Sequence, residues 1–228
     1  MKSMKSQQSG FTLVEIAIVL VIIGLLLGGV LKGQELIANA KVKNLVGDFR
    51  GISTMVFAYQ DKYRAFPGDQ DQLQLDAAFG TAAAALAATV TTKNGRIDGD
   101  WNTTDKTIES GLFWQHVRLA NLATGNPLTA DPNYFPVNAD GGRIGIESGV
   151  NAAGAAAPWI GGMTGAFYVC SDNIQGRYAK QIDTALDDGR TETGSVRAVL
   201  SAGAVRGGPG VVASAIVDGS LYIVCQSF

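Results

Sequence analysis

Apolar residues follow two successive patterns in the first part of the chain. Residues 11–31 read FTLVEIAIVLVIIGLLLGGVL, in which Thr12 and Glu15 carry the only polar side chains. A helix of this length, at about 1.5 Å per residue, extends roughly 30 Å, which is the thickness of the hydrocarbon core of a bilayer. The pattern therefore predicts a membrane-spanning helix over 11–31.

The second pattern is amphipathic and covers residues 32–64. Apolar side chains recur there in steps of four and three, the spacing of one face of an α-helix. No proline lies between Phe11 and Tyr63, so one continuous helix is allowed. The apolar face needs a partner, and we expect its aromatic residues to lie in a core. The positions are Ala38, Val42, Leu45, Phe49, Ile52, Val56, Tyr59 and Tyr63.

Shorter patterns follow Phe66-Pro67-Gly68-Asp69, where proline and glycine end the long helix. Helical spacing returns over 106–122, and we expect further short helices at 76–88 and 177–186. Residues 126–165 are rich in Gly, Ala, Asn and Pro and indicate loops. An antiparallel sheet is predicted by β-rich runs at 166–170, 196–205, 211–217 and 221–225. The fold class predicted is α+β, a long helix packed on a C-terminal antiparallel sheet within a globular head, 65–228.

Composition narrows the classes of function. The chain has 228 residues and a net charge of -2, so it lacks the broad basic surface of a nucleic-acid-binding protein. The only histidine, His116, has no nearby nucleophile, and we expect it to be structural or on the surface. We find no Ser/His/Asp arrangement, nucleotide fingerprint or paired catalytic carboxylates. The sequence therefore predicts no catalytic residues and a protein that is not an enzyme.

Charges near the apolar stretch predict its orientation. Lys2 and Lys5 precede it, which favours a cytoplasmic N-terminus and export of the remainder. An ordinary secretory signal is the alternative, because Ala38-Asn39-Ala40 resembles a cleavage site, but 11–31 is longer than the roughly 7–15 apolar residues of a cleaved signal. Glu15 is unusual, since an ionisable group in a membrane segment is costly and commonly functional. It is either a carboxylate at the interface or one that awaits a cation from another chain.

The sequence Gly10-Phe11-Thr12-Leu13-Val14-Glu15 follows a short basic leader and opens the apolar stretch. It resembles the processing motif of type IV prepilins and the related pseudopilins. The resemblance implies that prepilin peptidase removes residues 1–10 after Gly10, and that the new terminus, Phe11, is N-methylated. It further implies that Glu15 is the assembly carboxylate, which pairs with the terminal amine of a neighbouring subunit. The implied fold is pilin-like.

Cys170 and Cys225 are the only cysteines, and both lie in the part predicted to be exported. An even pair in an oxidising compartment predicts a disulfide. The pair also resembles the C-terminal disulfide-bounded region of type IV pilins, which many pseudopilins lack.

A weaker pattern suggests a cation site. Asp98, Asp100 and Asn102 alternate along the chain and Glu109 follows, which partly copies a calcium-binding loop. Thr103 stands where such a loop requires glycine. We therefore favour a solvated turn and expect no cofactor.

Taken together, the residues and the resemblance predict the structural subunit of a type IV pilus-like filament. It would be a single-pass inner-membrane protein first, and then part of a periplasmic or extracellular filament on the bacterial surface. The expected partners are identical or related pilin subunits, prepilin peptidase and the inner-membrane assembly machinery. Two alternatives stay open: a pseudopilin of a type II-like secretion system, and a membrane-tethered periplasmic binding protein or enzyme.

Overall fold

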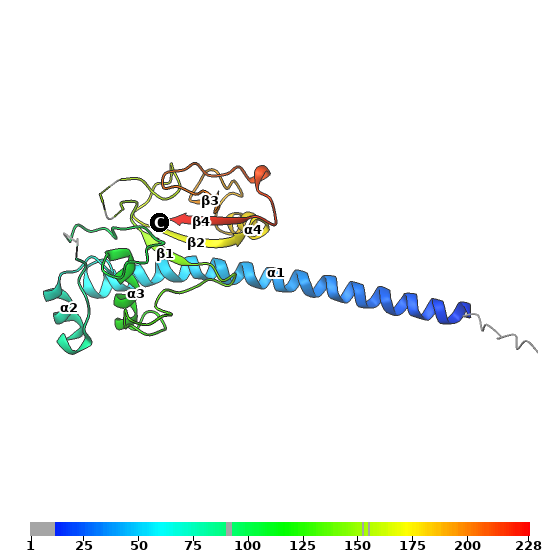
Figure 1. Cartoon of the computed structure of the whole chain (residues 1–228), viewed down its shortest axis with the longest axis horizontal. Helices are drawn as coiled ribbons and strands as arrows, with labels where there is room; N and C mark the ends of the chain where they lie inside the picture. Colours follow the sequence, from blue (N-terminus) through cyan, green and yellow to red (C-terminus); the bar gives the residue numbers. More distant parts are fainter. Residues whose placement is uncertain (1–11, 90–92, 152, 155) are drawn as a thin grey trace, which may run out of the picture. The chain divides into compact units, whose positions relative to one another are not determined.

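The computed structural model describes residues 12–89, 93–151, 153–154 and 156–228 (Figure 1). The chain divides into two compact units, Met1–Ala40 and Lys41–Phe228. Helix α1, Leu13–Tyr63, is continuous and contributes residues to both units. The single long helix predicted from the absence of proline is therefore confirmed.

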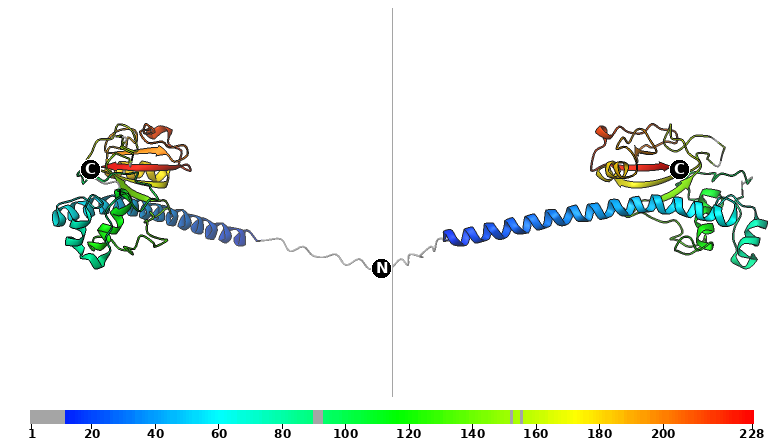
Figure 2. Two further views of the ribbon diagram at one scale, coloured as in Figure 1. Left: turned by 60° about the vertical axis from the view of Figure 1, so that its left-hand side comes forward. Right: turned by 180° about the vertical axis from the view of Figure 1, so that it is seen from behind.

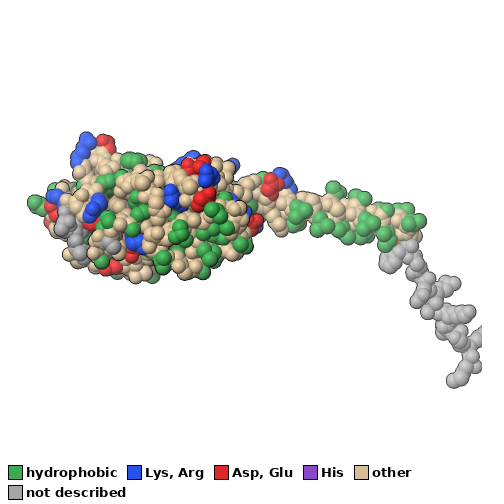
Figure 3. All heavy atoms as spheres, turned by 90° about the horizontal axis from the view of Figure 1, so that it is seen from above, with side chains coloured by type: hydrophobic (Ala, Val, Ile, Leu, Met, Phe, Trp, Pro, Cys, Tyr) green, Lys and Arg blue, Asp and Glu red, His purple; other side chains and the backbone are tan. Residues whose placement is uncertain are grey.

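In the first unit, the large apolar side chains of α1 are exposed. They include Leu13, Leu20, Leu25 and Leu31, each more than half accessible. Figure 3 shows such side chains in green along this part of the helix. By length and composition, α1 is the one helix among the described residues that could cross a membrane. An apolar surface of this extent is stable in lipid or against other apolar helices, and not in water.

In the second unit, α1 buries the face that the spacing predicts. Its buried apolar residues are Val42, Leu45, Val46, Phe49, Ile52, Val56 and Tyr59. Tyr63 is half-buried, and its ring lies 4.5 Å from that of Tyr59 and 5.1 Å from that of Phe79, centroid to centroid. The expected aromatic core is confirmed, and burial of each large apolar side chain contributes about 1.5–3 kcal/mol before entropic costs.

The sheet has four antiparallel strands in the order β1-β2-β4-β3. They are β1 (Ile144–Glu147), β2 (Tyr168–Gln175), β3 (Val196–Leu200) and β4 (Leu221–Ser227). Figure 2 shows from two further sides that the sheet lies along one side of the C-terminal part of α1. The predicted antiparallel sheet and the α+β class are confirmed.

Helices α3 (Glu109–Leu119) and α4 (Gly176–Leu186) lie where helical spacing predicts them. The expectation of a helix at 76–88 is wrong. Helix α2 spans Gln72–Phe79, and a separate 3-10 turn, η1, spans Thr81–Ala83. Asp71 begins α2 with a capping box to Gln74, and Gly80, at a φ of 79°, ends it.

Two expectations about strands are also wrong. Residues 211–217 form no strand; the connection between β3 and β4 contains a 3-10 turn, η2 (Ala213–Ala215), and leaves Val212 and Val217 exposed. Strand β1, in contrast, lies within the range expected to be loops. Its Gly145 passes so close to the chain that an added Cβ would lie 2.0 Å from the carbonyl oxygen of Trp101.

Candidate functional site

The N-terminal motif is only partly within the described residues, since Gly10 and Phe11 lie outside them. Thr12 and Glu15 are described, and they form a reciprocal cap at the start of α1. The Thr12 backbone N–H donates to Oε2 of Glu15 at 2.9 Å, and its hydroxyl donates to the same oxygen at 2.8 Å. The Glu15 backbone N–H donates to the Thr12 hydroxyl at 3.3 Å. The carboxylate is therefore held at the first turn of the helix.

This cap has a recognisable signal that our sequence reasoning missed. Thr-x-x-Glu before an apolar run is the pattern of a capping box, in which each residue binds the backbone of the other. The helix dipole also favours a negative charge at this end. Glu15 is thus already oriented within one chain, and a cation from elsewhere would add to these bonds or compete with them.

His116 is structural and lies in the interior, not on the surface. Its Nδ1 accepts the backbone N–H of Gly68 at 2.9 Å, and its Nε2 lies 2.9 Å from the carbonyl oxygen of Leu86. Complete burial lowers the pKa of His116 to about 4, so the ring is neutral at pH 7. Gly68 has a φ of 101°, and an added Cβ there would lie 2.5 Å from the Glu109 carbonyl oxygen. The histidine therefore joins the end of α1, the segment around Leu86, and α3.

The two cysteines form the disulfide that the sequence predicts. Cys170 of β2 and Cys225 of β4 are direct partners in the sheet register, and both are fully buried. The bond belongs to a hydrophobic cluster that includes Trp101, Ile160, Met163, Tyr168 and Ile223. It closes a separation of 55 residues, across α4, β3 and the β3–β4 connection.

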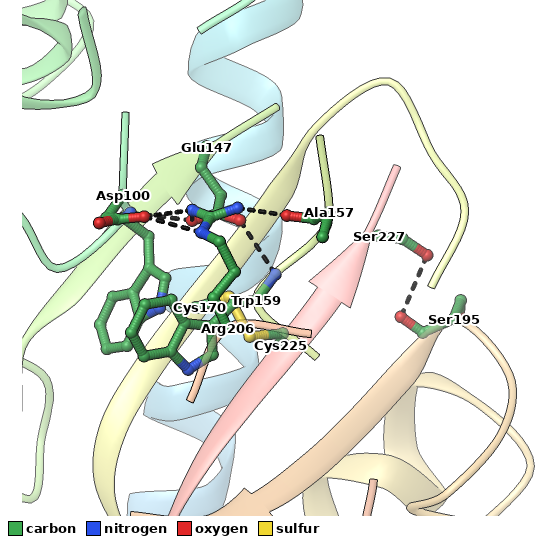
Figure 4. Close-up of a disulfide and its surroundings, with 10 residues drawn as sticks. Asp100, Glu147, Ala157, Trp159, Cys170, Ser195, Arg206, Cys225 and Ser227 are labelled. Carbon is green, nitrogen blue, oxygen red and sulfur yellow. Dashed lines mark hydrogen bonds and ion pairs between the residues drawn. A yellow bond between two sulfur atoms is a disulfide. The ribbon is translucent and has the colours of Figure 1, made fainter. Parts of the chain in front are cut away.

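Beside the disulfide, Arg206 lies between two carboxylates (Figure 4). Its Nη2 is 2.5 Å from Oδ1 of Asp100 and 2.6 Å from Oε2 of Glu147. Glu147 also accepts the backbone N–H groups of Trp101 at 3.0 Å and Trp159 at 3.1 Å. Burial raises the pKa of Glu147 to about 7, although the Arg206 charge opposes this shift. Sequence reasoning missed this cluster, because its three charged residues come from distant parts of the chain.

Three of the four calcium candidates have other partners within the chain. Asp98 accepts hydrogen bonds from Asn94 at 2.8 Å and Arg96 at 3.3 Å, while Asp100 binds Arg206. Oε2 of Glu109 accepts the backbone N–H of Asp98 at 2.5 Å. Asn102 lies in the turn after Asp100. Among the described residues, no group of three or more His, Cys, Asp or Glu side chains could hold a metal ion. The prediction of a solvated turn without a cofactor stays untested.

Comparison with known proteins gives one match. Residues 5–31 match the family model of the prokaryotic N-terminal methylation motif, which is the type IV prepilin-type motif. No curated protein and no solved structure matches the chain. The motif implies processing by prepilin peptidase and assembly into pilin filaments, and the proteins that carry it are structural. The chain therefore carries the type IV prepilin-type motif at the start of a long apolar helix, and its α+β architecture, with a four-stranded antiparallel sheet, is pilin-like.

Proposed function

We propose that this protein is the structural subunit of a type IV pilus-like filament. The observation that carries the proposal is the exposed apolar surface of α1 in a chain with the prepilin-type motif. Lipid covers such a surface while the protein is a single-pass precursor in the inner membrane. In a filament on the cell surface, the equivalent helices of neighbouring subunits replace the lipid.

The N-terminal residues have distinct roles in this proposal. Prepilin peptidase cleaves after Gly10, and Phe11 becomes the methylated terminus. Glu15 then pairs with the terminal amine of a neighbouring subunit. A charge within an apolar environment is costly when unpaired, so the pair favours association over the isolated subunit. The bonds from Thr12 support this role, because they hold the carboxylate at the first turn before a neighbour arrives.

A pseudopilin of a type II-like secretion system is the second candidate. It shares the N-terminal motif, so the head must distinguish the two. The buried disulfide between Cys170 and Cys225 favours the pilus subunit, because it encloses a C-terminal region of the kind that many pseudopilins lack. Fibres on the cell surface support the first candidate, whereas failed export of a secreted enzyme on deletion of the gene supports the second.

The mature N-terminus tests the processing step. Mass spectrometry of the protein sheared from cells should give a chain that begins at N-methylated Phe11. In cells without prepilin peptidase, the mass should correspond to a chain that begins at Met1. A mature chain that begins at Lys41 would contradict the proposal and indicate an ordinary secreted protein.

Substitution of Glu15 tests the assembly step. Glu15→Ala should leave the disulfide-bonded head folded but remove the protein from the sheared filament fraction. Glu35→Ala is the matched control, because Glu35 lies on the same helix and is already paired with Lys32 at 2.8 Å. Normal filaments from Glu15→Ala would contradict the assembly role of Glu15, whereas a wild-type protein that forms no filaments would favour a membrane-tethered binding protein or enzyme.

A further inference from the structure

A groove of about 310 Å³ lies along α1 in the second unit. Its lining includes Gly47, Asp48, Gly51 and Met55 of α1 and Trp114 and Arg118 of α3. We call it the α1 groove. It contains apolar surface, an aromatic ring and charged groups of both signs, which is the composition of a site for an amphipathic side chain.

Asp48 is the unpaired charge of this groove. Its side chain is half-buried, and no described residue gives its carboxylate a hydrogen bond or an ion pair. Arg118 also lines the groove, but its guanidinium donates to the carbonyl oxygens of Thr124 at 3.2 Å and Asn126 at 3.1 Å. A carboxylate that has lost part of its hydration without gaining a partner is unfavourable, and a cation from outside the chain would relieve that cost.

The two glycines of the groove leave room for such an approach. Gly47 and Gly51 are four residues apart in α1, and a Cβ added to either would have no atom within 4 Å. No contact with the described residues therefore requires glycine at these positions, although each glycine weakens the helix by about 0.5–1 kcal/mol relative to alanine. Small residues at this spacing allow another backbone to come close to a helix.

The same helix carries the complementary charges on a different face. Lys43 and Arg50 are seven residues apart, so they lie two turns apart on one exposed stripe. In the described part of the chain, neither has an ion-pair or hydrogen-bond partner for its side chain. Asp48 and Arg50 are two residues apart and point to different sides of the helix, so they cannot pair within one chain.

We propose that the α1 groove of one subunit receives Arg50 from a second copy of this chain, with its guanidinium on the carboxylate of Asp48. Arginine suits the site because its planar group binds a carboxylate through two parallel hydrogen bonds. The contact joins two different surfaces, so it is head-to-tail. Repetition of such a contact gives an open filament and not a closed dimer. The inference rests on the proposed filament function and adds a specific contact to it.

Charge reversal in full-length protein in cells tests the contact. Asp48→Lys and Arg50→Glu should each lower the sheared filament fraction by about tenfold or more, because each brings like charges together. The double variant Asp48→Lys/Arg50→Glu should restore filaments. Asp61→Lys is the matched control, since Asp61 is an exposed acidic residue of α1 that makes only a 3.9 Å contact with Arg64. Filaments at wild-type level from Asp48→Lys, or no rescue in the double variant, would overturn the proposal.

Cysteine cross-linking tests its geometry independently of filament yield. Cells that express Asp48→Cys and Arg50→Cys on separate chains should form covalent dimers under oxidation, and cells that express either variant alone should not. Equal cross-linking of each variant alone would indicate a symmetric contact and refute the head-to-tail one. Absence of cross-links in cells whose filaments are intact would also refute it. Absence of filaments from wild-type cells would instead count against the proposed function itself.

Discussion

Nη2 of Arg206 lies 2.6 Å from Oε2 of Glu147, and this ion pair joins the β3–β4 connection to the end of β1. Arg206 also donates to the carbonyl oxygen of Ala157 and to Asp100, so one side chain fixes three segments around the disulfide. Glu147 is fully buried, and its charge depends on Arg206 for compensation. The head therefore relies on a buried charge cluster as well as on its apolar core.

Substitution of Arg206 should be strongly destabilising. Arg206→Met keeps much of the side-chain volume but leaves Glu147 buried without its counter-ion, and we expect a loss of about 3–5 kcal/mol in the free energy of unfolding. Urea denaturation of the detergent-solubilised protein measures this loss. Arg190→Met is the control, because Arg190 is 65% exposed and its pair with Glu192 should contribute less than about 1 kcal/mol. If Arg206→Met loses no more unfolding free energy than Arg190→Met, the charge cluster contributes little to the stability of the head.

The pH dependence of stability should contain a component from His116. Its pKa is lowered to about 4 in the folded state, so between pH 6.5 and pH 4 the unfolded chain binds a proton that the folded chain does not. This component therefore stabilises the fold above pH 6.5. As the pH falls to 4, the free energy of unfolding should decrease by up to about 3 kcal/mol.

His116→Asn isolates that component, because asparagine keeps an acceptor for the Gly68 N–H but does not titrate. The variant should be less stable than wild type at pH 7, and the difference in unfolding free energy should shrink at pH 4.5. Urea denaturation at both values measures it. A difference that is independent of pH would mean that folding does not lower the pKa of His116.

Loss of the disulfide should destabilise the head substantially. The bond closes a separation of 55 residues, for which the chain-entropy relation gives about 4 kcal/mol. Cys170→Ala/Cys225→Ala should lower the unfolding free energy by roughly that amount, as measured by urea denaturation. Reduced wild-type protein is the control, because it lacks the disulfide bond but keeps both sulfur atoms in the core. Equal stability of oxidised and reduced wild type would contradict the prediction.

Replacement of a large side chain on the buried apolar face of α1 by alanine should weaken the packing of the helix against the head. Leu45 is fully buried, and Leu45→Ala should cost about 2–5 kcal/mol through lost apolar contact and a residual cavity. Asn44→Ala, at the exposed neighbouring position, should change stability by less than about 0.5 kcal/mol. Hydrogen exchange of the α1 amides in the second unit measures both. Unchanged protection in Leu45→Ala would place the stability of the helix elsewhere.

Patterns that depend on neighbouring residues could be found from the sequence. The apolar face that contains Val42, Leu45 and Phe49 can be identified from the sequence, because an α-helix repeats every 3.6 residues whatever packs against it. The boundaries of α2 were available too, since Asp71 and Gln74 form a capping box, but alanine-rich composition pointed instead to 76–88. Residues 211–217 show the opposite error, because β-rich composition does not create a strand without a partner to pair with.

The sequence by itself determined the prepilin-type motif around Gly10 and Phe11, the continuous helix with its apolar and amphipathic halves, and the pair of cysteines. Each of these is a local or compositional property that can be identified without knowing the fold. Only the tertiary structure decided that Arg206 binds Asp100, 106 residues away, and that Asp48 lines the groove with no partner for its carboxylate among the described residues. A charged side chain is paired only if folding brings an opposite charge from another segment within a few ångströms of it. The periodicity of the sequence does not predict which distant segments come together.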